Sequence, residues 1–267
     1  MSKSHFKLSS EQIDQVIELY KSGKTSSKLA FQFNVSDSSI LRYLEYRGVK
    51  RRSRSEINRK YQINKGVFNN KKEESSYWIG FLLADGSIEK RENRLDKIKI
   101  GLGIKDKLHL EKFNNFLGTD YKIYTTSKEP NDIVAISVTS NKLVERLSKF
   151  GIVPNKVKGT NPQNINNRHF WRGVIDGDGY LSKHSRDEKK EIGLAGSKQT
   201  CVKFKQFAKQ FSATEASINK ASGTFRWRTT GNYAIQIAKK LYENSSIYLK
   251  RKYKLAREWS EGPTQRE

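Results

Sequence analysis

The sequence predicts an α+β fold in two similar halves, with a small all-α unit in front of them. Residues 77–88 read YWIGFLLADGSI and residues 170–181 read FWRGVIDGDGYL, so one apolar, glycine-containing pattern recurs 93 residues later. Each copy is followed by segments with strand-like alternation and by amphipathic helical segments. Residues 9–49 show helical periodicity alone. We therefore expect a duplicated α+β unit behind a helical one.

Residues 1–50 are expected to form a helix-turn-helix unit. Ser9 or Ser10 can cap a first helix, and Ser36 can cap a third helix after a tight turn. The spacing resembles the small trihelical units of site-specific recombinases and repressors. That resemblance implies a third helix that enters the DNA major groove and contacts bases from three residues, Ser38, Ser39 and Arg42. The alternative is a three-helix packing module without a ligand.

Charge points to a polyanionic partner. The chain has 52 Lys and Arg against 28 Asp and Glu, a formal net charge of +24. Such a balance indicates nucleic acid or an acidic membrane surface. No apolar run is long enough to span a bilayer, so we expect no membrane partner. The N-terminus lacks the apolar core of a signal peptide, and a cytoplasmic location is expected.

The number of cysteines excludes disulfide bonds within the chain and zinc sites built from cysteines. Cys201 is the one cysteine of the chain, so an intrachain disulfide and a cysteine-based zinc site are both ruled out. The histidines show no spacing typical of metal ligands.

Residues 51–76 are predicted to be a basic linker. Arg51, Arg52 and Arg54 directly follow the third predicted helix, and Glu56 is the one acid between residues 47 and 72. Such a run is often only a solvated connection. Between two candidate DNA-binding units it is expected to follow phosphates.

Each half is expected to alternate helices and strands, with one apolar and one basic sheet face. The halves are assigned to residues 77–160 and 161–267. Apolar side chains alternate from Ile98 to Ile104, which is the pattern of a half-buried strand. Further strands are expected at residues 121–126 and 132–139, and further helices at residues 141–150 and 232–243.

Basic side chains on the outer faces of two predicted strands are candidate DNA contacts. Lys97 and Lys99 alternate with the inward isoleucines of the first half. Arg226 and Arg228 alternate with inward aromatic residues in the segment TFRWRTTG of the second half. These residues could be ordinary solvated cations, but their place on a strand face opposite an apolar core favours DNA contacts.

The aspartates that end the two apolar stretches are the candidate catalytic residues. Asp85 and Asp178 each close a helical run and precede a glycine. The partial negative charge at a helix C-terminus makes a carboxylate there unfavourable by up to about 1 kcal/mol. A positively charged group should therefore lie near these carboxylates and offset their charge, and a divalent metal ion is the obvious candidate.

Small residues on both predicted helices indicate a close contact. Gly80 and Ala84 are four residues apart, as are Gly173 and Gly177, so each pair lies on one helix face. Small residues let helix backbones approach more closely than the usual ~8–10 Å. Packing the two copies side by side would bring the two aspartates together.

These two motifs, WIGFLLADG and WRGVIDGDG, resemble those of the LAGLIDADG homing endonucleases over residues 77 to about 257. The resemblance implies two pseudo-symmetric αββαββα-type halves with saddle-shaped antiparallel sheets. It implies that Asp85 and Asp178, with the carbonyls of Ala84 and Gly177, bind a divalent metal such as Mg2+. It also implies a monomer that makes a staggered double-strand break in a long, asymmetric duplex site by phosphodiester hydrolysis.

Lysines at matching positions extend the resemblance. Lys105 and Lys198 each lie twenty residues after their aspartate, where members of that family carry a polar or basic residue near the scissile phosphate. Lys156 and Lys252 resemble the basic residues that polarise solvent or stabilise charge there. Plain phosphate contact or surface solvation is the alternative for each lysine.

The sequence departs from the family pattern at two places. The sixth motif position is Leu83 in the first copy and Asp176 in the second, and Asp176 is expected to serve in capping or packing. Ile104 precedes Lys105 where a polar residue is common, which allows the two centres to work unequally.

Two other functions remain open. An RNA-splicing maturase of the same fold would keep the basic faces, and a DNA-binding regulator would keep the fold without cleavage. The presence of both aspartates favours the nuclease, and the helix-turn-helix favours duplex DNA over RNA. Because the C-terminus lacks the His-Asn pair of an intein, we expect a free-standing enzyme encoded in an intron or between genes.

Overall fold

A computed structural model describes residues 7–52, 63–70, 72–127, 132–154, 162, 167–183 and 189–261. The chain divides into two units, Met1–Lys60 and Tyr61–Glu267, and each is described by itself. Within the described ranges, no helix is both long and apolar enough to cross a membrane. Arg54 and Lys156 lie outside the described residues.

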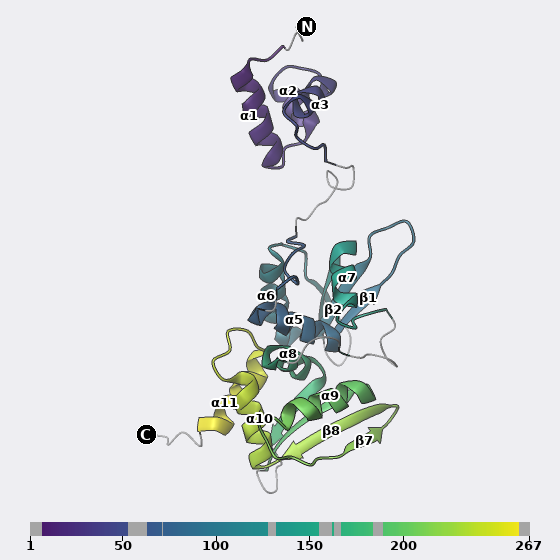
Figure 1. The fold of residues 1–267 in the computed structure, drawn as a ribbon, viewed down its shortest axis with the longest axis vertical. Helices are drawn as coiled ribbons and strands as arrows, with labels where there is room; N and C mark the ends of the chain where they lie inside the picture. The colour runs from purple at the N-terminus through teal and green to yellow at the C-terminus, as the bar shows by residue number, and fades with distance from the viewer. Residues whose placement is uncertain are drawn as a thin grey trace. The chain divides into compact units, whose positions relative to one another are not determined.

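The first unit is the predicted bundle of three helices (Figure 1). They are α1 (Ser10–Lys21), α2 (Ser26–Gln32) and α3 (Asp37–Tyr46). Apolar side chains from all three helices form one core, which includes Val16, Leu29, Ile40, Tyr43 and Leu44.

Hydroxyl side chains begin these helices where the sequence predicts. The Ser9 hydroxyl accepts a hydrogen bond from the Gln12 N–H at 3.3 Å, so Ser9 rather than Ser10 is the cap of α1. The Ser36 hydroxyl accepts from the Ser39 N–H at 3.1 Å and caps α3. Each cap satisfies a backbone donor that the helix leaves without an internal partner.

The second unit contains two four-stranded antiparallel sheets with the same topology, β1-β2-β4-β3 and β5-β6-β8-β7. The first half comprises α5 (Glu73–Ala84), β1 (Gly86–Glu89), β2 (Lys97–Gly103), η1 (Ile104–Asp106), α6 (Lys107–Leu117), β3 (Tyr124–Thr126), β4 (Ile133–Thr139) and α7 (Asn141–Ser148). The second half comprises α8 (Arg168–Asp178), β5 (Gly179–Lys183), β6 (Lys190–Gly196), α9 (Lys198–Ala208), β7 (Ile218–Ala221), β8 (Thr224–Thr230), α10 (Asn232–Tyr242) and α11 (Lys250–Glu261). The predicted duplication and α+β class are confirmed.

Each sheet buries one face under helices. Helices α6 and α7 contact the first sheet, and α9 and α10 contact the second (Figure 1). Ile98, Ile100 and Leu102 of β2 are buried as expected, and their neighbours in the strand face outward. The core therefore lies between the sheets and their helices, and the opposite sheet faces carry the exposed residues of the strands.

Several boundaries differ from the prediction, among them the start of β3 at Tyr124, the end of β2 and the start of α5. Ile104 is 44% exposed in a 3-10 turn rather than buried in a strand, because Gly103 pairs with Ile133, the first residue of β4, and the ladder ends there. Helix α5 begins at Glu73, inside the predicted linker, and the preceding Phe68 is fully buried in the second unit's core.

Helices α5 and α8 touch through their backbones. A Cβ built on Gly80 would lie 2.0 Å from the Phe170 carbonyl oxygen, and one built on Gly173 would lie 2.1 Å from the Tyr77 carbonyl oxygen. No side chain larger than hydrogen fits at either position. The predicted close packing of the two motif helices is confirmed, and it joins the two halves.

We expect Gly80→Ala to destabilise the chain by about 3 kcal/mol, because the new methyl group must push one helix backbone from the other. Chemical denaturation followed by circular dichroism would measure the loss. Gly103→Ala is the matched control, since no other atom lies within 4 Å of a Cβ built there. Equal stabilities for the two variants would contradict the proposed contact.

Candidate active site

The aspartates of the two motifs lie at the same end of the helix pair. Asp85 follows the last residue of α5, and Asp178 is the last residue of α8. A Cβ built on Gly177 would lie 2.3 Å from the Ala84 Cβ and 3.3 Å from Asp85 Oδ2, so the Asp85 carboxylate reaches the end of the opposite helix. Asp85 is half-buried and Asp178 is exposed. The structure thus brings the two predicted acids to one place.

The donors at this place fit a hard divalent cation. They are the carboxylates of Asp85 and Asp178 and the carbonyls of Ala84 and Gly177, all of them oxygen atoms. The described residues contain no group of three or more His, Cys, Asp and Glu side chains that could hold a metal alone. A cation here would therefore complete its shell with water or with phosphate oxygens, as Mg2+ commonly does.

Lys252 of α11 lies against the end of α8. Its Nζ donates to the carbonyl oxygens of Ile175 at 2.6 Å, Asp176 at 2.8 Å and Gly179 at 2.6 Å. The Asp176 carbonyl lies in the last turn of α8, where a helix leaves carbonyls without internal partners, whereas the Ile175 carbonyl also accepts from the Gly179 N–H. The side chain is buried, so the surface-solvation alternative is wrong for Lys252.

The electrostatics of Lys252 connect it to both acids. Burial lowers its pKa to about 8, against the opposing effects of Asp176, Asp85 and Asp178, which raise it. An ammonium group at a helix C-terminus is favourable because it faces the negative end of the helix dipole. Lys252 is thus one positive group that offsets the unfavourable position of Asp178.

The other predicted lysines occupy different surroundings. Lys105 is exposed in the turn η1, and Lys198 is exposed as the first residue of α9. They share a position in the sequence of each half but not the same local structure. Of the three described lysines, Lys252 is the one that is buried against the end of α8.

We expect Lys252→Met to destabilise the chain by roughly 3 kcal/mol, because buried carbonyls at the end of α8 lose their donor. Thermal and denaturant unfolding would measure the change. Lys198→Met replaces an exposed lysine and should stay within about 0.5 kcal/mol of the parent. Equal effects of the two substitutions would show that Lys252 does not stabilise this helix end.

Asp176, at the sixth motif position, is fully buried, and its carboxylate accepts hydrogen bonds from residues that are not candidate metal donors. Its Oδ1 accepts a hydrogen bond from the Tyr242 hydroxyl at 2.6 Å. Its Oδ2 accepts from the Tyr77 hydroxyl at 2.8 Å and from the Leu249 N–H at 2.7 Å. Burial raises the pKa of Asp176, while Lys252 and these hydrogen bonds oppose that rise. The expected packing role of Asp176 is confirmed.

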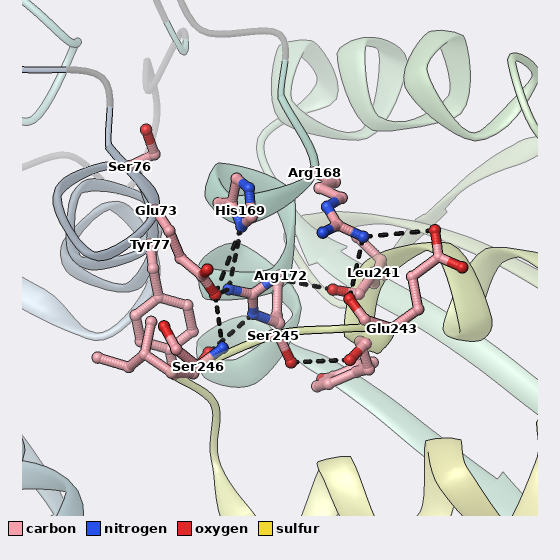
Figure 2. A network of polar contacts seen from close by, with 12 residues as sticks. Glu73, Ser76, Tyr77, Arg168, His169, Arg172, Leu241, Glu243, Ser245 and Ser246 are labelled. Atoms are coloured by element: carbon pink, nitrogen blue, oxygen red, sulfur yellow. Dashed lines mark hydrogen bonds and ion pairs between the residues drawn. The ribbon is translucent and has the colours of Figure 1, made fainter.

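A second buried charge, Arg172, ties the two motif helices to the connection before α11 (Figure 2). Its Nη2 lies 2.6 Å from Glu73 Oε1, and its other nitrogens donate to the carbonyls of Ile247 and Leu241 at 2.8 and 2.9 Å. Glu73 Oε1 also accepts from the Ser246 N–H at 2.8 Å. Burial raises the pKa of Glu73, but Ser246 and Arg172 outweigh it and the pKa is lowered.

Sequence reasoning did not identify this network. One signal was available, because Arg172 interrupts an apolar run and a charge in such a place needs a partner. The partners themselves lie far away in the chain, at Glu73 and in the segment before α11.

Tyr77 links Asp176 to a buried histidine. The Tyr77 hydroxyl donates to Asp176 and lies 2.8 Å from His109 Nε2, so His109 must donate its own proton to the tyrosine oxygen. His109 is therefore a neutral imidazole protonated on Nε2. Burial lowers the pKa of His109 to about 3.

This histidine makes stability depend on pH. The unfolded chain binds a proton at His109 near pH 6.5, and the folded chain does so only near pH 3. The folded state is therefore favoured above pH 6.5 and loses about 2 kcal/mol between pH 7 and pH 5 through this one group. We expect His109→Gln to remove this contribution, so that the free energy of unfolding, measured by denaturant titration, falls less between pH 7 and pH 5 than in the wild-type protein. An unchanged pH dependence would contradict the neutral assignment.

The outer sheet faces carry the predicted basic residues. Lys99 is exposed and pairs with Glu89, while Lys97 is half-buried. Arg226 and Arg228 are exposed on β8. The alternation that placed all four residues on the outer faces is confirmed.

In the first unit, the predicted contact residues lie at the start of α3. The Ser38 and Ser39 hydroxyls each lie 2.8 Å from the Ser36 hydroxyl, and Arg42 is exposed one turn later. Side chains at a helix start of this kind can meet base edges or phosphates.

Arg51 and Arg52, the two described arginines of the predicted linker, have different partners. Arg51 Nη2 lies 2.7 Å from Glu45 Oε2 at the surface. The Arg52 guanidinium lies 4.1 Å from the centre of the Tyr20 ring, and its Nη1 donates to the Gly23 carbonyl at 3.1 Å. Arg52 therefore anchors the segment that follows α3 to the turn after α1.

Comparisons with known proteins agree with both units. The model of a helix-turn-helix domain of resolvase matches residues 6–47. Among curated proteins, none matches the sequence. Meganuclease I-SmaMI, bound to uncleaveable DNA, is similar in structure with a TM-score of 0.52 and 13% identity over 70% of this chain and 87% of that chain.

Two further solved structures are similar. A lysine-to-alanine variant of I-SmaMI gives a TM-score of 0.50 and 14% identity over 70% of this chain and 89% of that one. The LAGLIDADG meganuclease I-AabMI, bound to uncleaved DNA, gives a TM-score of 0.49 and 12% identity over 69% and 88%. The chain thus combines a helix-turn-helix domain of the resolvase type with the fold of the LAGLIDADG meganucleases.

Proposed function

We propose that the protein is a site-specific DNA endonuclease that makes a staggered double-strand break in a long, asymmetric duplex site. One observation carries the proposal: Asp85 and Asp178 end two helices that touch through their backbones. Two carboxylates in this position fit two hydrolytic centres, one for each strand. The similarity to the meganuclease I-SmaMI, whose structure contains uncleaveable DNA, supports the same proposal.

The donors proposed for a divalent cation such as Mg2+ are Asp85, Asp178 and the carbonyls of Ala84 and Gly177. A bound ion would supply activation of water and neutralisation of the leaving oxygen. Lys252 stabilises the end of α8 and so holds Asp178 in place. Lys105 and Lys198 are exposed and are proposed to contact phosphates. Lys156 is proposed as the counterpart of Lys252 in the first half.

DNA binding is proposed to use the outer faces of both sheets and the helix-turn-helix domain. The outer sheet faces, with Lys97, Lys99, Arg226 and Arg228, would contact the core site. The helix-turn-helix domain, assigned to residues 1–50, would bind adjacent duplex and raise affinity through its linkage to the core. Duplication gives one chain two different half-site surfaces, so we propose that it acts as a monomer.

We expect Asp85→Asn and Asp178→Asn each to abolish double-strand cleavage, by at least about a hundredfold, because each removes charge needed at one centre. DNA binding should change little. The measurement is cleavage of a partly randomised duplex library in Mg2+ and in EDTA, with band shifts on the same duplexes. Asp120→Asn alters an exposed aspartate and serves as the matched control.

The outcomes separate the competing functions. Full cleavage by both aspartate variants would show that the assigned site is wrong. Tight binding by the wild-type protein without metal-dependent cutting would identify a DNA-binding regulator. Binding of structured RNA alone would favour the maturase.

A further inference from the structure

The outer faces of the two sheets differ in charge at equivalent places. In the first sheet, Gly86 pairs with Ile100, and in the second, Gly179 pairs with Leu194. Ile100 of β2 and Leu194 of β6 therefore occupy equivalent places. Three residues earlier in each strand, Lys97 is equivalent to Glu191, and one residue earlier, Lys99 is equivalent to Gly193. The second middle strand thus presents an acid and a glycine where the first presents two lysines.

The ring of Tyr180 explains why residue 193 is a glycine. Tyr180 of β5 is paired with Gly193 of β6, and a Cβ on Gly193 would lie 2.5 Å from two atoms of the tyrosine ring. The ring therefore occupies the space that a side chain at residue 193 would need. The Tyr180 hydroxyl donates to Glu191 Oε1 at 2.6 Å. Burial and Glu191 raise the pKa of Tyr180 to about 12, so it stays a donor at neutral pH.

Glu191 connects this tyrosine to an arginine on the next strand. Its Oε2 lies 3.7 Å from Arg228 Nη1, and Arg228 is paired with Gly193 across the sheet. The Glu191 side chain is 7% exposed, whereas that of Arg228 is 57% exposed. Arg228 thus lies beside a buried carboxylate, at ion-pair distance, and is otherwise exposed; both residues line a shallow hollow.

Arg226 provides a contrast on the same strand and the same face. It is exposed and forms no ion pair within the part of the chain that the structure describes. Two arginines two residues apart on one strand face therefore differ in whether a carboxylate lies beside the guanidinium.

The Glu191 carboxylate beside Arg228 favours an uncharged base edge over a charged phosphate as the DNA group that Arg228 contacts. A phosphate brought to Arg228 would also approach the Glu191 carboxylate, and the two negative charges would repel. The major-groove edge of guanine is uncharged and offers two acceptors, O6 and N7, which match the two parallel donors of a guanidinium. An arginine without an adjacent acid has no such bias and suits a phosphate.

We propose that Arg228 recognises a guanine in the half-site bound by the second sheet, with Glu191 and Tyr180 as its positioning residues, and that Arg226 contacts phosphate. The inference rests on the proposed function, because it requires that this sheet face binds duplex DNA. It goes further by naming the residue and the base of one specific contact.

The test selects bound duplexes from a randomised library with the full-length protein. We expect the wild-type protein to enrich guanine at one position that Arg228→Ala relaxes by about tenfold or more, with other positions unchanged. Glu191→Gln and Tyr180→Phe should relax the same position to a smaller extent. Arg226→Ala, the matched control, should weaken all selected duplexes alike and lower the salt dependence of binding. Thermal unfolding checks that each variant is folded.

Three results would overturn the inference. A uniform loss of affinity in Arg228→Ala would make Arg228 a phosphate contact. An unchanged base preference in folded Glu191→Gln would show that Glu191 does not position the arginine. If the wild-type protein enriches no sequence at all, the proposed site-specific function fails as well, and this result is distinct from the other two.

Discussion

The backbone contact between α5 and α8 is the constraint on which the rest of the second unit depends. It requires glycine at residues 80 and 173, because the carbonyls of Phe170 and Tyr77 occupy the space of a side chain. It also places the C-terminal ends of both helices, and with them Asp85 and Asp178, in one region. Negative helix ends and carboxylates together are unfavourable. Lys252 offsets this at α8, and a divalent cation is proposed to offset the remainder.

The two halves share a topology but are stabilised differently at this contact. The second half has Asp176 where the first has Leu83, and this acid binds Tyr77 of the first half, Tyr242 and the backbone of Leu249. The same connection before α11 also binds Glu73 and thereby Arg172. These hydrogen bonds fix the start of α11, from which Lys252 reaches the end of α8. A polar network distant from the candidate metal donors thus orients the residue that supports one of them.

The outer sheet faces of the two halves carry different side chains at equivalent places. The inner faces of both sheets keep apolar residues, because helices cover them and the core must stay filled. On the middle strands, the outer face carries Lys97 and Lys99 in one half and Glu191 and Gly193 in the other, where Tyr180 and two arginines lie beside them. An uncovered face can change its charges with little loss of stability. Two surfaces of different chemistry on one fold are what an asymmetric duplex site requires.

The sequence by itself determined the duplication, the α+β class, the cap of α3 and the faces on which Lys99 and Arg228 lie, and it narrowed the cap of α1 to Ser9 or Ser10. These features follow from spacing along a short stretch of chain, and local geometry is enough to predict them. Alternation alone carried the predicted strand one residue too far, to Ile104, because the end of a strand depends on its partner. The tertiary structure alone decided that Lys252 is buried on three carbonyls, that Arg172 binds Glu73 and that Glu191 restrains Arg228. Burial, hydrogen bonding and pKa depend on which residues meet in space, and most of these partners are far apart in the chain.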